Sequence, residues 1–137
     1  MRERSRDIDR LLHIREAINS INAYLSGRTM EAMSADPMCY HAVVYNIMII
    51  GEAANMLTHE FRAEHPDTPW RDIVDMRNVL VHGYYTTSPI FVWETYTDNL
   101  PQLLEQVEQY IQIERTQMQD MKDDAHLLPR PSATPST

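Results

Sequence analysis

Three times in the first ninety residues, a residue that favours the N-cap position of a helix is followed directly by proline. The pairs are Asp36-Pro37, Thr68-Pro69 and Ser88-Pro89. The side chain of an N-cap residue accepts a hydrogen bond from a free N–H of the first turn, and proline fits the next position because its φ is already helical. Each pair therefore predicts the start of a helix, and the three starts constrain the chain to a series of helices joined by loops.

Apolar residues ahead of the first pair recur at alternating steps of three and four, which places them on one face of a helix. We expect this first helix to run from about Ser5 to Ser26, with an inner face formed by Leu11, Ile14, Ile18, Ile21 and Leu25. Gly27 follows, and glycine is the preferred residue at the left-handed C-cap position. Residues 28–36 then form a connector with room for one helical turn.

The helix that begins at Pro37 is expected to reach about Phe61 and to lie at the centre of the fold. Its middle, AVVYNIMIIGEAANML, is apolar nearly all round, which is typical of a helix covered on most sides. Gly51 favours close approach of a neighbouring helix, since glycine inside a helix otherwise costs about 1 kcal/mol relative to alanine. Glu52 is a carboxylate that would be unfavourable if buried alone. It is paired, exposed at an interface or directed at the site, and structural pairing is the favoured interpretation.

Two further helices complete the prediction, separated from the central helix by a polar loop over residues 62–68. The third runs from Pro69 to Gly83 with an inner face of Trp70, Ile73, Met76 (or Arg77) and Leu80. The fourth begins at Pro89 and carries the stripe Ile90, Trp93, Thr97, Leu100, Leu104, Val107 and Ile111. Pro101 lies inside this stripe and, because it removes the hydrogen bond to the carbonyl of Thr97, should kink the helix there.

These segments predict an all-α protein, an antiparallel bundle of four main helices. Residues 1–118 would form the bundle, and residues 119–137 a flexible tail, because the sequence there becomes polar and rich in proline. The N-terminus is charged, Cys39 is the only cysteine, and no apolar run reaches the roughly 18 residues of a membrane span. We therefore expect a cytoplasmic protein without a membrane segment.

The net charge of −8 argues against a general coat for nucleic acids, because non-specific affinity for a polyanion comes mostly from lysine and arginine. The charge is uneven, however. Arginines gather in the first fifteen residues, and Lys122 is the one lysine among twelve basic residues. Arginine is the side chain suited to forked contacts with phosphate. Any contact with RNA would therefore be local.

The last turn of the third helix holds the candidate chemistry, which is formed by Arg77, Asn78 and His82. Asn78 and His82 are one turn apart on the same face, whereas Arg77 lies about 140° from His82 in a regular helix. Arg77 and His82 would converge only if the last turn departs from regular geometry or a two-fold axis brings in a second copy of the helix. The negative end of the helix dipole favours the protonated form of His82, which suits acid–base catalysis.

Such a set of residues suits metal-free cleavage of RNA, in which Arg77 would stabilise charge on the phosphorane. The competing interpretation is structural, with Arg77 and Asn78 bracing the helix end and His82 serving as a C-terminal cation. Other signals are weaker. The spacing of His59 and His65 does not match a zinc-binding helix, and three glycines cannot supply a phosphate-binding glycine loop. We expect no metal site and no cofactor site.

The segment from Arg77 to Tyr84 has the pattern R-x4-H-x-Y and resembles the HEPN domain family, specifically the HepT toxins encoded beside a minimal nucleotidyltransferase antitoxin (MntA). The similarity extends over most of residues 5–115. Other stretches that resemble this group are Ile50-Gly51-Glu52-Ala53-Ala54, Trp70-Arg71-Asp72-Ile73, and Trp93 with Leu100-Pro101 and Leu103-Leu104.

The resemblance implies a HEPN-like domain that forms a homodimer, with motif residues of both chains lining one cleft. It implies a ribonuclease toxin in which Arg77 and His82 are catalytic and Asn78 is a supporting residue. It also implies that the partner, using ATP and Mg²⁺, transfers AMP to the hydroxyl of Tyr84. Added phosphate beside the arginine and histidine would compete with RNA for the same cations. Tyr85 stays open as an alternative acceptor.

Two other functions compete with this one. The chain could be a non-catalytic HEPN partner subunit of a nucleotidyltransferase, with the motif as a docking or substrate segment. It could also be a dimeric helical scaffold in which Arg77 and His82 are structural. Loss of nuclease activity without loss of folding in a His82 variant separates the first function from both of these.

Overall fold

The structure is a computed structural model that describes residues 2–83 and 88–127, with side chains described for residues 6–83 and 88–125. The elements are α1 (Arg2–Leu25), α2 (Met30–Ala35), α3 (Pro37–Met56), α4 (His59–Glu64), α5 (Trp70–Gly83), α6 (Pro89–Glu94), a π-helical segment η1 (Thr95–Asn99) and α7 (Leu100–Leu127). No strand occurs in the described part of the chain, so the all-α prediction is confirmed.

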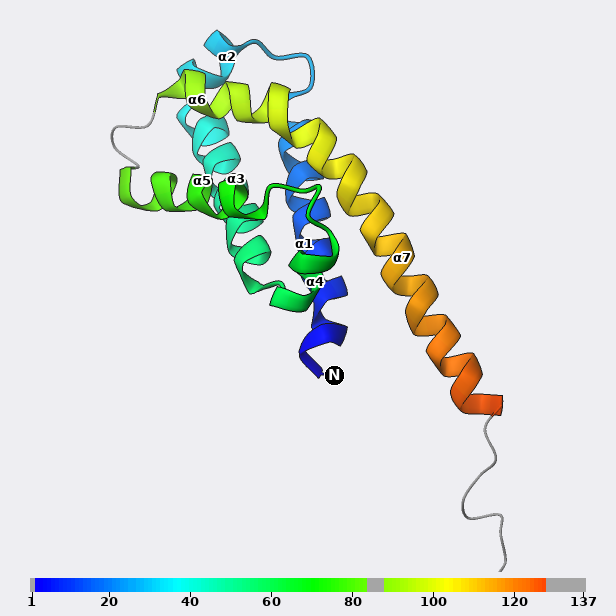
Figure 1. The fold of residues 1–137 in the computed structure, drawn as a ribbon. Helices are drawn as coiled ribbons and strands as arrows, with labels where there is room; N and C mark the ends of the chain where they lie inside the picture. Colours follow the sequence, from blue (N-terminus) through cyan, green and yellow to red (C-terminus); the bar gives the residue numbers. More distant parts are fainter. Residues whose placement is uncertain (1, 84–87, 128–137) are drawn as a thin grey trace, which may run out of the picture.

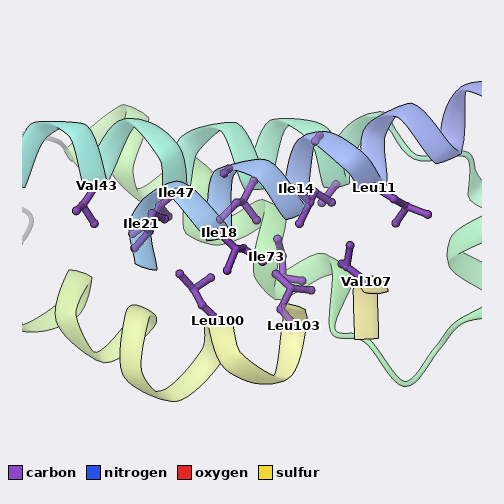
Figure 2. Close-up of a cluster of buried hydrophobic side chains, with 14 of the residues drawn as sticks. Leu11, Ile14, Ile18, Ile21, Val43, Ile47, Ile73, Leu100, Leu103 and Val107 are labelled. Carbon is purple, nitrogen blue, oxygen red and sulfur yellow. The ribbon is translucent and has the colours of Figure 1, made fainter. Parts of the chain in front are cut away.

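Helices α1 and α3 pack along each other, α5 lies across α3, and α6, η1 and α7 form one bent rod (Figure 1). The core lies where α1, α3, α5 and the start of α7 meet (Figure 2). Every residue of the inner face predicted for the first helix is buried there. Gly27 has a φ of +73°, as expected of a left-handed C-cap. Within the described ranges, no helix has both the length and the apolar character required to cross a membrane.

Two of the three predicted start signals work as expected. The carboxylate of Asp36 accepts the N–H of Cys39 at 3.2 Å, and the hydroxyl of Ser88 accepts the N–H of Ile90 at 3.1 Å. The connector also contains the helical turn for which it had room, since α2 forms there with Thr29 as its N-cap. These helix starts are local in origin, because each cap bonds an N–H two or three residues away.

The third predicted start signal, Thr68-Pro69, does not act as an N-cap through the threonine hydroxyl. Thr68 is buried, and its hydroxyl donates to Oε1 of Gln106 in α7 at 2.8 Å and lies against the hydroxyl of Tyr110. Helix α5 therefore begins at Trp70, whose indole N–H donates to the carbonyl of His65. The pair Thr68-Pro69 ties the start of α5 to α7, a role that no local pattern shows.

The central helix ends earlier than predicted, at Met56 instead of Phe61. Leu57 is extended, with a ψ of 145°, and Thr58 begins α4 by accepting the N–H of Phe61. The buried carboxylate of Asp7 in α1 accepts both the N–H of Thr58 at 2.9 Å and its hydroxyl at 2.7 Å. Because Asp7 satisfies the backbone at the break, the chain turns there, and α4 occupies part of the predicted loop.

The fourth helix contains a π-helical turn that the predicted stripe did not anticipate. The N–H of Leu100 bonds the carbonyl of Thr95, five residues back, just before Pro101, which has no N–H to give. The extra residue shifts the register, so that Ile90 and Thr97, predicted to lie inside, are exposed. The buried positions are Val92, Thr95, Leu100, Leu103, Val107, Tyr110, Ile111 and Glu114. The expected disturbance at Pro101 is confirmed, and its form is a π turn.

Helix α7 continues past residue 118, where the composition placed the end of the bundle, and reaches Leu127. Its last third extends beyond the other helices (Figure 1). Arg15 of α1 and Glu108 of α7 form an ion pair at 3.9 Å. One of the arginines near the N-terminus is therefore neutralised by a carboxylate of the same chain. Residues 128–137 of the expected tail lie outside the described residues.

Asp36 gives the fold a testable response to pH. Its hydrogen bond from Cys39 and the guanidinium of Arg28, 3.1 Å away, hold the pKa of its carboxyl below the ordinary value of 3.8. A lowered pKa in the folded state means that the stabilisation is present above pH 3.8 and is lost as the pH falls below it. We expect D36N to unfold at lower urea concentration than wild type near neutral pH, and this gap to close below pH 3.8. A gap that does not change with pH would contradict the assignment.

Candidate functional site

Helix α5 is regular from Trp70 to Gly83 and carries the three predicted site residues in its last two turns. Trp70, Ile73 and Leu80 are buried, and Met76 is half-buried, so the predicted inner face is confirmed. The aromatic contacts of Trp70 fix the start of this helix. Its ring meets Phe61 of α4 and Tyr110 of α7 with centroids about 6 Å apart. The helix is thereby held at its far end while the motif end stays accessible.

Gly51 lets α5 lie directly against α3 at the position of Arg77. A Cβ on Gly51 would overlap the Cβ of Arg77 and come within 3.1 Å of the carbonyl oxygen of Ile73. The close approach predicted from a glycine inside an apolar helix is confirmed. Gly51 therefore sets the distance between the two helices at the residue proposed to stabilise charge.

The guanidinium of Arg77 is held by two partners. Nη2 lies 3.1 Å from Oε2 of Glu52 in α3, and Nη1 donates to Oδ1 of Asn78 at 2.9 Å. The pairing predicted for Glu52 is confirmed, and the structure identifies the partner that the sequence left open. The side chains of Arg77 and Glu52 are 32% and 52% exposed, so the pair adds little to stability. Its effect is to orient the guanidinium.

His82 is exposed and lies one turn beyond Asn78 on the same face of α5. Since α5 is regular, Arg77 points about 140° away from His82, and a single chain does not place the two side chains on one face. Asn78 lies between the two around the helix, and its carbonyl oxygen accepts a hydrogen bond from the Arg77 guanidinium. The irregular last turn considered as one route to convergence does not occur in the described residues.

Exposed apolar side chains occur at this end of α5 and on α3. Val79 and Val81 are 51% and 38% exposed, and Tyr45 of α3, two turns before Glu52, is 63% exposed. Tyr45 and Glu52 lie on the same face of α3, since seven residues make nearly two full turns. Tyr84 and Tyr85, the predicted and alternative sites of modification, lie outside the described residues.

His65 and Cys39 pack within the fold. The ring of His65 packs on Phe61 and Tyr110, and Cys39 is buried at the start of α3. Among the described residues, no three His, Cys, Asp or Glu side chains are arranged to hold a metal ion.

The structure is thus a helical bundle that holds an arginine, an amide and a histidine at one accessible helix end. The family model described as "Ribonuclease HepT-like" matches residues 14–110, which include α3, α5 and the whole motif up to Tyr84. The chain therefore belongs to the HepT-like ribonuclease family, and the resemblance inferred from the motif is confirmed.

Several relatives carry names consistent with this family. The protein "Putative RNase TTE0752" of Caldanaerobacter subterraneus subsp. tengcongensis is 34% identical over 105 residues, which are 77% of this chain and 94% of that one. The protein "Probable ribonuclease HepT" of Thermococcus cleftensis is 33% identical over 95 residues, which are 69% of this chain and 86% of that one. No solved structure matches the chain.

Proposed function

We propose that this protein is the toxin of a toxin–antitoxin pair, a metal-independent endoribonuclease that acts in the cytoplasm. Arg77 and His82 are its catalytic residues, Asn78 supports them, and the active form is a homodimer. A cognate nucleotidyltransferase antitoxin, similar to MntA and using ATP and Mg²⁺, neutralises it by adding AMP to Tyr84. The observation that carries the proposal is the Arg77 guanidinium, oriented by Glu52 and Asn78 beside the face of His82.

The chemistry assigns one task to each side chain. A base removes the proton of a ribose 2′-OH, and the oxygen attacks the adjacent phosphorus. The bond from phosphorus to the 5′-oxygen breaks, and an acid protonates that oxygen, which leaves a 2′,3′-cyclic phosphate and a 5′-OH. His82 supplies proton transfer, and Arg77 stabilises the extra negative charge on the phosphorane. This reaction needs no metal and no cofactor in the toxin.

The directions in which the side chains point support the proposed homodimer. Arg77 and His82 lie about 140° apart around a regular helix, so one chain cannot direct both at the same phosphate from one face. A two-fold axis near the end of α5 would bring His82 of one chain toward Arg77 of the other. The exposed apolar residues Tyr45, Val79 and Val81 offer contact area around such an axis.

The nuclease is tested with a single-stranded RNA in the presence of EDTA. We expect cleavage, a 2′,3′-cyclic phosphate end, and no cleavage where the ribose at the scissile position is replaced by 2′-deoxyribose. Cleavage of the 2′-deoxy substrate, or dependence on a divalent ion, would contradict the mechanism. Absence of all cleavage, together with AMP transfer to the chain, would favour the alternative of a non-catalytic HEPN partner subunit of a nucleotidyltransferase.

Modification of Tyr84 should be visible in the intact mass. We expect the chain co-expressed with its nucleotidyltransferase to gain the mass of one AMP, or a multiple of it. It should also lose nuclease activity, because the added phosphate would interact with Arg77 and His82 in place of the RNA phosphate. Y84F should prevent the gain, whereas Y85F, the matched control, should leave it unchanged. A gain that persists in Y84F and disappears in Y85F would assign the acceptor to Tyr85.

A further inference from the structure

A basic groove lies next to the proposed active site, on the side of the N-terminal half of α5. Two open cavities of about 510 and 390 Å³ share the lining residues Asn55, His59 and Arg62, so they form one continuous groove. Helix α5 borders one end with Arg71, and α1 borders the other end. We call this surface the arginine groove and define it by its four arginines, Arg6, Arg10, Arg62 and Arg71.

The charge of the groove is opposite to that of the chain. Among the described residues that line the two cavities, Asp75 is the only acidic side chain, against four arginines. The whole chain has a net charge of −8. Arginines from three separate helices (α1, α4 and α5) thus converge on one surface of an acidic protein. Such a concentration favours a local anionic ligand, because the protein as a whole repels polyanions.

The arginines of the groove also have unused donors. The buried Nε of Arg62 has no hydrogen-bond partner among the described residues, and Nη2 of the same side chain lies 3.5 Å from Nδ1 of His59. No described carboxylate lies within ion-pairing distance of Arg6, Arg10 or Arg71, in contrast to Arg28 and Arg15, which are paired elsewhere. Donors in this state favour an acceptor from outside the chain.

The groove shares one face of α5 with two of the motif residues, Asn78 and His82. With about 100° per residue, Arg71, Asp75, Asn78 and His82 fall within roughly 60° of one another around the helix. On α3, Asn55 lines the groove one turn after Glu52, so the groove begins about one helical turn from the ion pair of Arg77. Along α5, Arg71 is about 9 Å from Arg77. The groove therefore extends away from the proposed scissile position. The distance between the two is short enough for neighbouring nucleotides of the same RNA strand to reach the groove.

We propose that the arginine groove binds backbone phosphates of single-stranded RNA that flank the scissile phosphodiester. This inference rests on the proposed nuclease function and extends it to the substrate, an RNA strand several nucleotides long, held by phosphates more than by bases. The groove contacts the backbone through guanidinium groups, which recognise phosphate without selecting sequence. A dinucleotide, whose single phosphate is the scissile one, has no phosphate to place in the groove.

The test measures binding of a fluorescent single-stranded oligoribonucleotide over a range of KCl concentrations, in an H82A background that leaves the RNA intact. We expect R10Q/R62Q to weaken binding at least tenfold and to reduce the slope of log K against log salt by ~0.7 for each phosphate that the groove no longer neutralises. R115Q, which removes an exposed arginine of α7 outside the groove, is the matched control and should leave the slope unchanged. R6Q/R10Q, confined to α1, repeats the test if R10Q/R62Q does not fold.

Cleavage separates the groove from the nuclease itself. With His82 intact, R10Q/R62Q should raise KM for the long RNA, leave kcat nearly unchanged, and cleave a dinucleotide as well as wild type does. Wild-type cleavage combined with unchanged binding and salt slope in both groove variants would overturn the groove and leave the nuclease standing. Failure of the wild type to cleave either substrate would overturn the nuclease, while the binding arm would still decide the groove. If the groove variants bound RNA normally but no longer bound the nucleotidyltransferase, the groove would be a contact site for that protein instead.

Discussion

H82A should lower the rate of RNA cleavage by about 10²–10⁴-fold, the usual contribution of a positioned acid or base. Its melting temperature should stay close to that of wild type, because the side chain is exposed and makes no hydrogen bond to another described residue. H13A, which removes an exposed histidine of α1, is the matched control and should retain full activity. If H82A melted several degrees lower and still cleaved RNA, His82 would be a structural cation.

R77A should show a similar loss for a different reason. It removes the donor that stabilises the phosphorane, an effect of about 10²–10³-fold when one such group is lost. Glu52 then keeps its charge without a partner, but it is 52% exposed, so water replaces the guanidinium and stability changes little. E52Q should therefore reduce activity less than R77A, because Arg77 would still be held by Asn78.

The two inactive variants together test the dimer. If Arg77 of one chain acts with His82 of its partner, a heterodimer of R77A and H82A contains one intact site. Random exchange of equal amounts should then restore roughly a quarter of the wild-type activity, since half the dimers are mixed and each has one of two sites. If Arg77 and His82 of the same chain act together, every site in the mixture is defective, and no activity returns.

The sequence predicted what depends on near neighbours. The helix starts at Asp36 and Ser88, the inner faces of α1 and α5, and the glycine C-cap all follow from residues within one turn. It did not predict the break at Leu57, because the carboxylate that stabilises it, on Asp7, lies 51 residues earlier than its partner. Contacts over such distances leave no periodic signal in the chain.

The predicted inner face of the last helix was wrong in part for a related reason. Pro101 predicts a disturbance, but the choice between a kink and a π turn depends on which side chains of this helix the core buries, and Thr95 and Leu100 are both buried. At the site, the motif assigns the proposed chemistry to Arg77, Asn78 and His82 of α5. It did not predict that Glu52 orients Arg77, or that arginines from other helices converge beside it, because both require the arrangement of α1, α3, α4 and α5.

G51A should have the largest effect among substitutions outside the motif, on stability as well as activity. The new Cβ would overlap the Cβ of Arg77, which is fixed to the backbone of α5 and cannot rotate away, so α5 must move off α3. Overpacking of this kind costs about 1–3 kcal/mol, and alanine regains about 1 kcal/mol of helix propensity, so we expect a net loss of up to about 2 kcal/mol. Because Arg77 moves with α5, cleavage should fall about a hundred-fold, as for displacement of a catalytic group by about 1 Å.

A double-mutant cycle isolates the cause. In an R77A background the Cβ remains, so G51A should still destabilise the protein. In an R77G background the Cβ is absent, and G51A should become neutral or stabilising by up to about 1 kcal/mol, the propensity difference alone, with a small residual contact to the Ile73 carbonyl. Urea unfolding of the two pairs measures this change of sign. Equal effects of G51A in both backgrounds would show that the approach of α5 to α3 is not limited by Arg77, and that the glycine is retained for another reason.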